Sequence, residues 1–230
     1  MILGWFYYDW TILIVLPALL FTIWAQIKVN SSFNKYSGIR TSRGITGADA
    51  ARRILDANGL YNVRIEKVRG SMTDHFDPRT NVVRLSETVH DVASVAALGV
   101  AAHEVGHAIQ YARHYAPIKL RSAIIPVTRV GSMLAMPIFI LGLLLANDAF
   151  LLVGIFLYSF VTLFQLVTLP VEFNASRRAM KTLEGQGILY GEELSGAKDV
   201  LSSAAMTYVA ALATSLLSLI RLITLANRRR

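Results

Sequence analysis

Two histidines and a glutamate within five residues form the pattern with the clearest chemistry in this chain of 230 residues. His103 and His107 are four positions apart, so in a helix both imidazoles lie on one face and can bind the same tetrahedral metal ion. Glu104 follows the first histidine, and its carboxylate is expected near the ion without being a ligand. There it can take a proton from a water that the ion activates and later pass it to a leaving amine. The run predicts a hydrolytic centre with one Zn²⁺ per chain.

A catalytic zinc needs a third protein ligand and an open position for water. The chain contains no cysteine, so this ligand is a histidine or a carboxylate. His114 lies about two helical turns beyond His107, which is too far if the helix continues. Glu172 is the better candidate, because an apolar hairpin that leaves the membrane face after the motif returns to that face just before Glu172. The alternative is a surface acid at a helix end, paired with Arg177 or Arg178.

Apolar stretches of membrane-spanning length set the organisation of the chain. Apolar residues make up 54% of the sequence, which is more than soluble domains usually contain. Three runs are long enough to cross a bilayer, at residues 10–27, 124–145 and 150–169, and the last two form a helical hairpin. A fourth run at 204–225 carries a stripe of small and polar residues. It either packs in the bundle as a fourth span or lies at the membrane interface.

The charged residues indicate a membrane-flanking distribution. The net charge of +8 is scattered between the apolar runs, which fits a lipid bilayer as partner and no nucleic acid. The first run lacks a basic leader and a small-residue cleavage site, so it is expected to be an uncleaved anchor. Basic residues directly after this anchor place the following domain in the cytoplasm by the positive-inside rule; they are Lys28, Lys35, Arg40 and Arg43.

Between the first two apolar runs the sequence predicts a small domain of mixed structure. A helix is expected at 48–58, because Thr46 and Asp49 resemble a capping box and Gly59 suits a left-handed stop. Alternating patterns predict two half-buried strands, at 63–68 and within 81–86, with a turn at 77–80 between them. A buried helix is expected from about 89 to 112 around the histidine motif.

These elements predict an α+β membrane protein that is mainly helical. It combines a zincin-like catalytic domain, which contains a small β-sheet, with three or four transmembrane helices. The expected segments are an N-terminal transmembrane anchor at 1–29, the catalytic domain at 30–121, the transmembrane hairpin at 122–169, a cytoplasmic segment with the third zinc ligand at 170–203, and a C-terminal apolar helix with a basic tail at 204–230.

Four stretches carry a resemblance to a known family; they are TDHFDP at 73–78, VRLS at 83–86, GVAAHEVGHAIQ at 99–110 and PVEFNASRRA at 170–179. Together they resemble the neutral zinc metallopeptidase family of bacterial membrane proteases, over nearly the whole chain. The resemblance implies a zinc peptidase of the bacterial cytoplasmic membrane that acts on a protein or peptide. It also implies His103, His107 and Glu172 as zinc ligands and Glu104 as catalytic acid and base.

A more distant likeness is to integral-membrane gluzincins, whose glutamate ligand lies in a Glu-x-x-Ala-Asp pattern. Ser176 stands where that pattern has Asp, so no role in orienting a ligand histidine is carried over to Ser176. In zincins generally an edge strand above the motif helix binds the peptide, and residues 82–86 are either that strand or an ordinary sheet strand. His75 can stabilise an oxyanion or contact substrate; the alternative is a solvated or structural histidine in a turn.

Two hypotheses about function follow. The first is peptide-bond hydrolysis at the zinc centre. The second is a membrane scaffold or partner protein whose metal site is structural or vestigial, because no transition-state donor beyond the core motif is evident in the sequence. If the chain binds zinc and a chelator removes it, the enzyme hypothesis is favoured. If the chain binds no metal, only the scaffold hypothesis is left.

Overall fold

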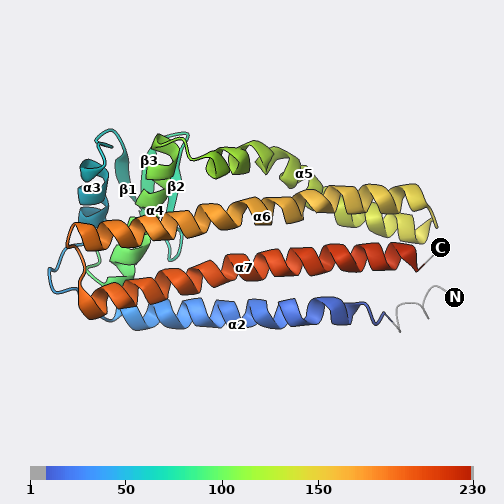
Figure 1. Cartoon of the computed structure of the whole chain (residues 1–230), viewed down its shortest axis with the longest axis horizontal. Coiled ribbons are helices and arrows are strands. Elements are labelled where there is room, and N and C mark those ends of the chain that lie inside the picture. Colours follow the sequence, from blue (N-terminus) through green and yellow to red (C-terminus); the bar gives the residue numbers. More distant parts are fainter. Residues whose placement is uncertain (1–8, 229–230) are drawn as a thin grey trace. The chain divides into compact units, whose positions relative to one another are not determined.

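The computed structural model describes residues 9–228 and groups the chain into two compact units (Figure 1). Unit 1 contains the chain up to Ala25, Leu120–Leu169 and the chain from Thr207; unit 2 contains Gln26–Lys119 and Pro170–Met206. The helices are α2 (Ile12–Ser37), α3 (Gly47–Ala57), α4 (Val95–Ala112), α5 (Ala116–Leu144), α6 (Asp148–Gly185) and α7 (Gly191–Asn227), and the strands are β1 (Arg64–Val68), β2 (His75–Asp77) and β3 (Val82–Ser86). The start of the predicted anchor, 1–8, and the end of the basic tail, 229–230, lie outside the described residues.

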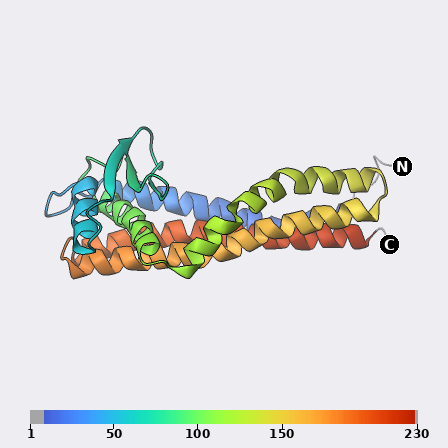
Figure 2. The same cartoon turned by 90° about the horizontal axis from the view of Figure 1, so that it is seen from above.

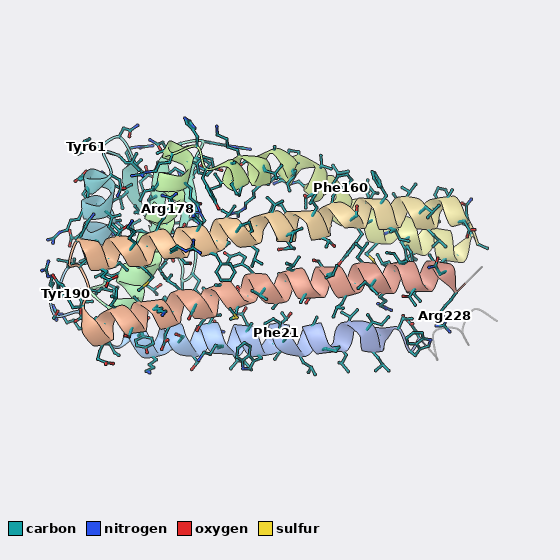
Figure 3. The ribbon with its side chains drawn as sticks, viewed as in Figure 1. Phe21, Tyr61, Phe160, Arg178, Tyr190 and Arg228 are labelled. Atoms are coloured by element: carbon teal, nitrogen blue, oxygen red, sulfur yellow. The ribbon has the colours of Figure 1, made fainter. Side chains whose placement is uncertain are left out.

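Unit 1 is built from parts of the four long apolar helices. By length and composition, α2, α5, α6 and α7 can each cross a membrane, so the described chain has four candidate spans. Large apolar side chains are exposed along them; Leu20, Leu141 and Phe156 are examples. Figure 3 shows the side chains of the helices as sticks and labels Phe21 on α2 and Phe160 on α6. Such surfaces suit lipid rather than water, and helices satisfy their own backbone hydrogen bonds there.

Small residues and hydroxyl groups join the helices of unit 1. A Cβ added at Gly131 would come within 2.7 Å of the carbonyl oxygen of Leu157, so α5 and α6 approach closely there. The Thr162 hydroxyl of α6 donates to the carbonyl oxygen of Ser215 on α7 at 3.3 Å. The hydroxyls of Thr22 on α2 and Thr214 on α7 are 3.1 Å apart. The fourth apolar run therefore packs in this bundle as part of α7.

The sheet of unit 2 has three strands in the order β1-β3-β2. β1 pairs with β3 in parallel, and β2 pairs with β3 antiparallel, with Phe76 opposite Val83. The two predicted strands are confirmed, but β2 was not predicted. β3 lies in the centre with both edges paired, so residues 82–86 form an ordinary sheet strand rather than an edge strand. The edge next to the motif helix belongs to β2.

The two short helices of unit 2 pack on each other, and α4 also packs against β2 and β3, as Figures 1 and 2 show. The predicted capping box is present, since Thr46 accepts from the backbone of Asp49 while the Asp49 side chain accepts from Thr46. Gly59 has a φ of 74°, the left-handed conformation expected after α3. α4 begins later than predicted, because Ser94 caps it by accepting from the backbone N–H of Ala97 at 3.2 Å.

The helix that carries Glu172 is longer than its apolar run. α6 continues through Pro170 to Gly185, although proline removes one backbone donor from the helix. Glu172 therefore lies within a regular helix instead of following one. Residues three and four positions further on, Ala175 and Ser176, share the helix face of Glu172.

Candidate metal centre

The two motif histidines lie one turn apart in α4 with their side chains half-buried. Their ring centroids are 4.8 Å apart and the rings are nearly perpendicular, at 86°. This follows directly from the four-residue spacing in a helix, because Cβ atoms at i and i+4 lie on the same face. Both Nε2 atoms point toward the same carboxylate, that of Glu172 on α6.

Glu172 is 2% exposed and lies against both histidines. Its Oε2 atom is 3.3 Å from Nε2 of His103 and 3.5 Å from Nε2 of His107. The three residues form a group whose ligand atoms all lie within 4.8 Å of one another. α4 and α6, which are distant in sequence, are thus brought together at the three side chains that the sequence analysis selected.

Gly106 explains how α4 and α6 come so close. A Cβ at this position would lie 2.7 Å from the carbonyl oxygen of Ala175, which real side chains do not tolerate. The partner is the turn of α6 directly after Glu172, so the missing side chain helps to place the third member of the group.

The remaining ring nitrogens of the histidines have partners that the sequence did not predict. Nδ1 of His103 lies 3.1 Å from the hydroxyl oxygen of Ser176. Nδ1 of His107 lies 3.0 Å from Oε1 of Gln110. Ser176, to which no ligand-orienting role was carried over from the gluzincin pattern, provides the hydroxyl group of the contact with His103. In the sequence, the available signals for these two partners are their spacings: Ser176 follows Glu172 by four residues and Gln110 follows His107 by three.

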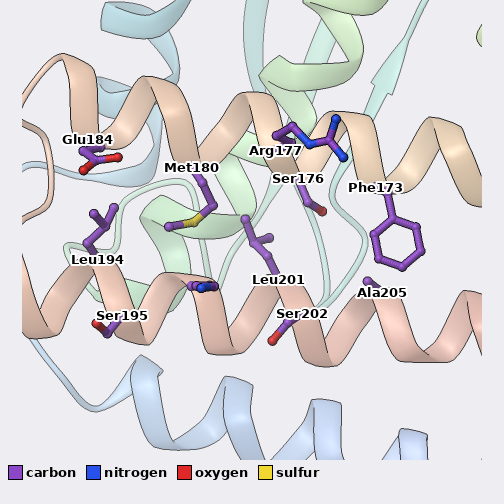
Figure 4. Close-up of a pocket in the computed structure, with 11 residues that line it drawn as sticks. Phe173, Ser176, Arg177, Met180, Glu184, Leu194, Ser195, Leu201, Ser202 and Ala205 are labelled. Atoms are coloured by element: carbon purple, nitrogen blue, oxygen red, sulfur yellow. The ribbon is translucent and has the colours of Figure 1, made fainter.

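Ser176 also lines an open groove of about 560 Å³ between α6 and α7 in unit 2 (Figure 4). Apolar side chains such as Phe173, Met180 and Leu201 line much of the groove, and Arg177 of α6 is among its charged residues. The hydroxyl group that contacts His103 is therefore half-buried rather than enclosed.

Glu104 is 9% exposed and accepts a hydrogen bond of 3.1 Å from the backbone N–H of Phe76 on β2. The ring of Phe76 packs against Tyr111 of α4, with centroids 5.5 Å apart. Because side chains alternate along a strand, His75 projects from the opposite side of β2. His75 is exposed and its Nδ1 is 2.8 Å from the carbonyl oxygen of Thr73. Its role stays a prediction.

Negative charge dominates the electrostatics around His107. Burial lowers the pKa of His107, but the hydrogen bond to Glu172 and the charges of Glu104 and Glu172 outweigh burial, so the net pKa is raised. The carboxylates therefore favour positive charge between the imidazole and Glu172.

Comparisons with known proteins show the family of this chain. A family described as "Putative neutral zinc metallopeptidase" matches residues 11–227. The chain belongs to this family. "Putative membrane protease YugP" of Bacillus subtilis (strain 168) is 49% identical over 212 residues, which cover 92% of this chain and 94% of that protein. No solved structure matches.

In a member of the neutral zinc metallopeptidase family the cofactor is zinc, and the donors in this chain fit that ion. Two imidazole nitrogens and one carboxylate oxygen are the ligand set of many catalytic zinc sites, which keep a fourth position open. A buried carboxylate such as Glu172 is costly unless a cation or hydrogen-bond donors compensate it. The four candidate spans and the membrane-protease relative identify this family member as a multi-pass membrane protein.

Proposed function

We propose that the protein is a membrane-embedded zinc metallopeptidase that hydrolyses peptide bonds, with His103, His107 and Glu172 as the ligands of one zinc ion. The observation that carries the proposal is the convergence of these donors beside Glu104, on two helices packed through Gly106. Zinc bound there supplies a Lewis acid that lowers the pKa of water and polarises the carbonyl group of the substrate.

Glu104 is the general base and acid of the proposed mechanism. It follows His103 in the helix, so its carboxylate lies beside the metal ligands without being one of the three grouped residues. It accepts a proton from the attacking water and transfers it to the leaving amine. The hydrogen bond from the N–H of Phe76 holds one carboxylate oxygen and leaves the other for proton transfer.

The proposed substrate site is the edge of β2 that does not pair with β3. The Phe76 N–H is directed to Glu104 and away from β3, so this edge of the strand faces the catalytic glutamate. An extended peptide that adds to the edge of β2 would lie beside Glu104, and main-chain hydrogen bonds would supply affinity with little sequence preference. His75 lies on the same strand and is exposed, which leaves it as a candidate for substrate contact.

We further propose that the protein lies in the bacterial cytoplasmic membrane with unit 2 in the cytoplasm. Lys28, Lys35, Arg40 and Arg43 follow the apolar part of α2 within the first residues of unit 2. Basic residues this close to a span are the ones that set orientation.

The membrane proteomes of cells that produce the wild type or Glu104→Gln test the proposed activity. Substrates should accumulate uncleaved with Glu104→Gln, because its neutral amide cannot accept the proton. Glu184→Gln is the matched control, since Glu184 is exposed at the end of α6 and no side-chain hydrogen bond or ion pair of it is found among residues 9–228. Identical proteomes for the wild type and Glu104→Gln, with both proteins folded and loaded with zinc, would contradict the peptidase and favour the scaffold.

A further inference from the structure

Gln110 is a fully buried polar residue at the centre of a hydrogen-bond network that the proposed mechanism does not use. Its side chain is 0% exposed. Besides the contact of Oε1 with Nδ1 of His107 at 3.0 Å, Nε2 donates to the carbonyl oxygen of Val171 at 2.8 Å and to Oδ1 of Asn174 at 3.1 Å. All partners lie in α4 or in the part of α6 that belongs to unit 2.

The carbonyl group of Val171 determines which atoms of this network donate hydrogen bonds and which accept them. The carbonyl oxygen of Val171 can only accept, so the amide atom of Gln110 that faces it is the NH₂ group. The other amide atom is then the oxygen, which can only accept, and Nδ1 of His107 has to be the donor. A neutral His107 with its proton on Nδ1 presents the lone pair of Nε2 toward Glu172, at 3.5 Å. This lone pair is directed to the place where an ion bound by both His107 and Glu172 would lie.

His103 has no such constraint. Its Nδ1 contacts the hydroxyl of Ser176, which can donate or accept and lines the open groove of Figure 4. The two histidines are therefore held differently, one by a buried amide of fixed direction and one by a hydroxyl that can rotate.

The same amide joins the helices that carry the ligands. Val171 precedes Glu172 and Asn174 follows it by two residues, so both α6 partners of Gln110 flank the third ligand. Oδ1 of Asn174 also accepts from Nε of Arg178 at 2.7 Å, which fixes its orientation. A shift of α6 along α4 would break these bonds together.

We propose that Gln110 is a positioning residue of the metal centre: its amide holds His107 in the Nδ1–H tautomer and, through Val171 and Asn174, holds Glu172 in register with it. Only a carboxamide meets both requirements, since it has an acceptor for the imidazole and two donors for α6. A glutamate would keep the acceptor but place a second oxygen against the carbonyl of Val171.

The test compares Gln110→Met, Gln110→Glu and the wild type, and it rests on the proposed zinc site. Gln186→Met is the matched control, because Gln186 follows α6 in unit 2 and no side-chain hydrogen bond or ion pair of it is found among residues 9–228. Zinc affinity is measured by competition with a chelator. The histidine tautomers of the zinc-free protein are read from ¹⁵N chemical shifts. The pH is set above the raised pKa of His107, so that its imidazole is neutral.

Gln110→Met is expected to lower zinc affinity about 10- to 100-fold and to give a mixture of His107 tautomers, as expected for loss of a group that orients a ligand. Gln110→Glu should keep the Nδ1–H pattern and still bind zinc more weakly. This variant therefore separates the effect of the His107 tautomer from the effect of the hydrogen bonds to α6. If Gln110→Met does not fold, Asn174→Ala should lower the affinity while the nitrogen pattern is kept. Unchanged affinity and unchanged nitrogen shifts in Gln110→Met overturn the proposal, whereas a wild type that binds no zinc contradicts the proposed function instead.

Discussion

The backbone N–H of Phe76 donates a hydrogen bond of 3.1 Å to Oε2 of Glu104, so the edge strand and the proposed general base are directly connected. The strand β2 has only three residues and pairs with a single neighbour, β3. Its position beside the metal centre therefore depends partly on this hydrogen bond to α4 and on the packing of the Phe76 ring against Tyr111.

Glutamine and alanine at position 104 should separate catalysis from this structural role. Glu104→Gln keeps an oxygen that can accept from Phe76, so β2 should stay in place while proteolysis falls by roughly 10²- to 10⁴-fold. Glu104→Ala loses both functions, and the amide hydrogen of Phe76 should exchange faster with solvent. Hydrogen exchange read by mass spectrometry checks this, and equal exchange of Phe76 in both variants would show that the contact does not hold the strand.

Two glycines of α4 give a matched test of the helix contact that places Glu172. Gly106→Ala forces a Cβ to 2.7 Å from the carbonyl oxygen of Ala175 and should destabilise the fold by about 1–3 kcal/mol, while also weakening zinc binding. Gly99→Ala places its Cβ at an ordinary 3.5 Å from Ala197 and should be neutral or stabilising, since alanine favours helices. Thermal unfolding followed by circular dichroism measures both. Equal unfolding temperatures would mean that α6 can move away at no cost.

Asp77 predicts a pH dependence of stability. Hydrogen bonds from Thr80, Arg84 and the backbone N–H of Arg79 lower its pKa well below the ordinary value. A depressed folded pKa means that the stabilisation is fully present above the ordinary pKa of about 3.8 and is lost as the pH falls below it toward the folded pKa. Asp77→Asn should therefore be less stable than the wild type at neutral pH, and the two melting temperatures should converge in acid. A difference in melting temperature that stays constant with pH would show that the lowered pKa of Asp77 is not the source of the stabilisation.

The complete absence of cysteine makes the proposed orientation easy to test. Ser71→Cys lies in an exposed loop of unit 2, and Ala149→Cys is exposed at the start of α6, beside the turn of the hairpin. An impermeant maleimide should label Ser71→Cys only in inverted membrane vesicles and Ala149→Cys only in right-side-out vesicles. The reverse pattern would place unit 2 outside the cytoplasm, although the hairpin would still return Glu172 to the side of the motif.

The parts of the structure that could be predicted from the sequence depend on local rules. The spacing of His103 and His107 predicts their shared helix face, and the lengths of the apolar runs predict candidate spans. Glu172 was found by counting crossings, because an even number of spans returns the chain to one side of a membrane. The capping box at Thr46 is likewise a local pattern.

The missed features depend on contacts between distant residues. β2 has three residues, too few for an alternating pattern, and exists because it pairs with β3 and is bonded to Glu104. Gln110 and Ser176 acquire their roles only when α4 crosses α6 at Gly106. No spacing rule within either helix specifies where that crossing occurs.

Zinc binding by Glu172→Gln, measured against the wild type, tests the central claim most directly. The purified wild type should hold one zinc per chain, and a chelator should remove it together with the proteolytic activity. Glu172→Gln is nearly isosteric but loses the anionic ligand, so its zinc affinity should fall by more than the roughly 10- to 100-fold expected for an outer partner. Wild type without zinc, or Glu172→Gln that binds zinc as tightly as the wild type, would contradict the His103, His107 and Glu172 centre.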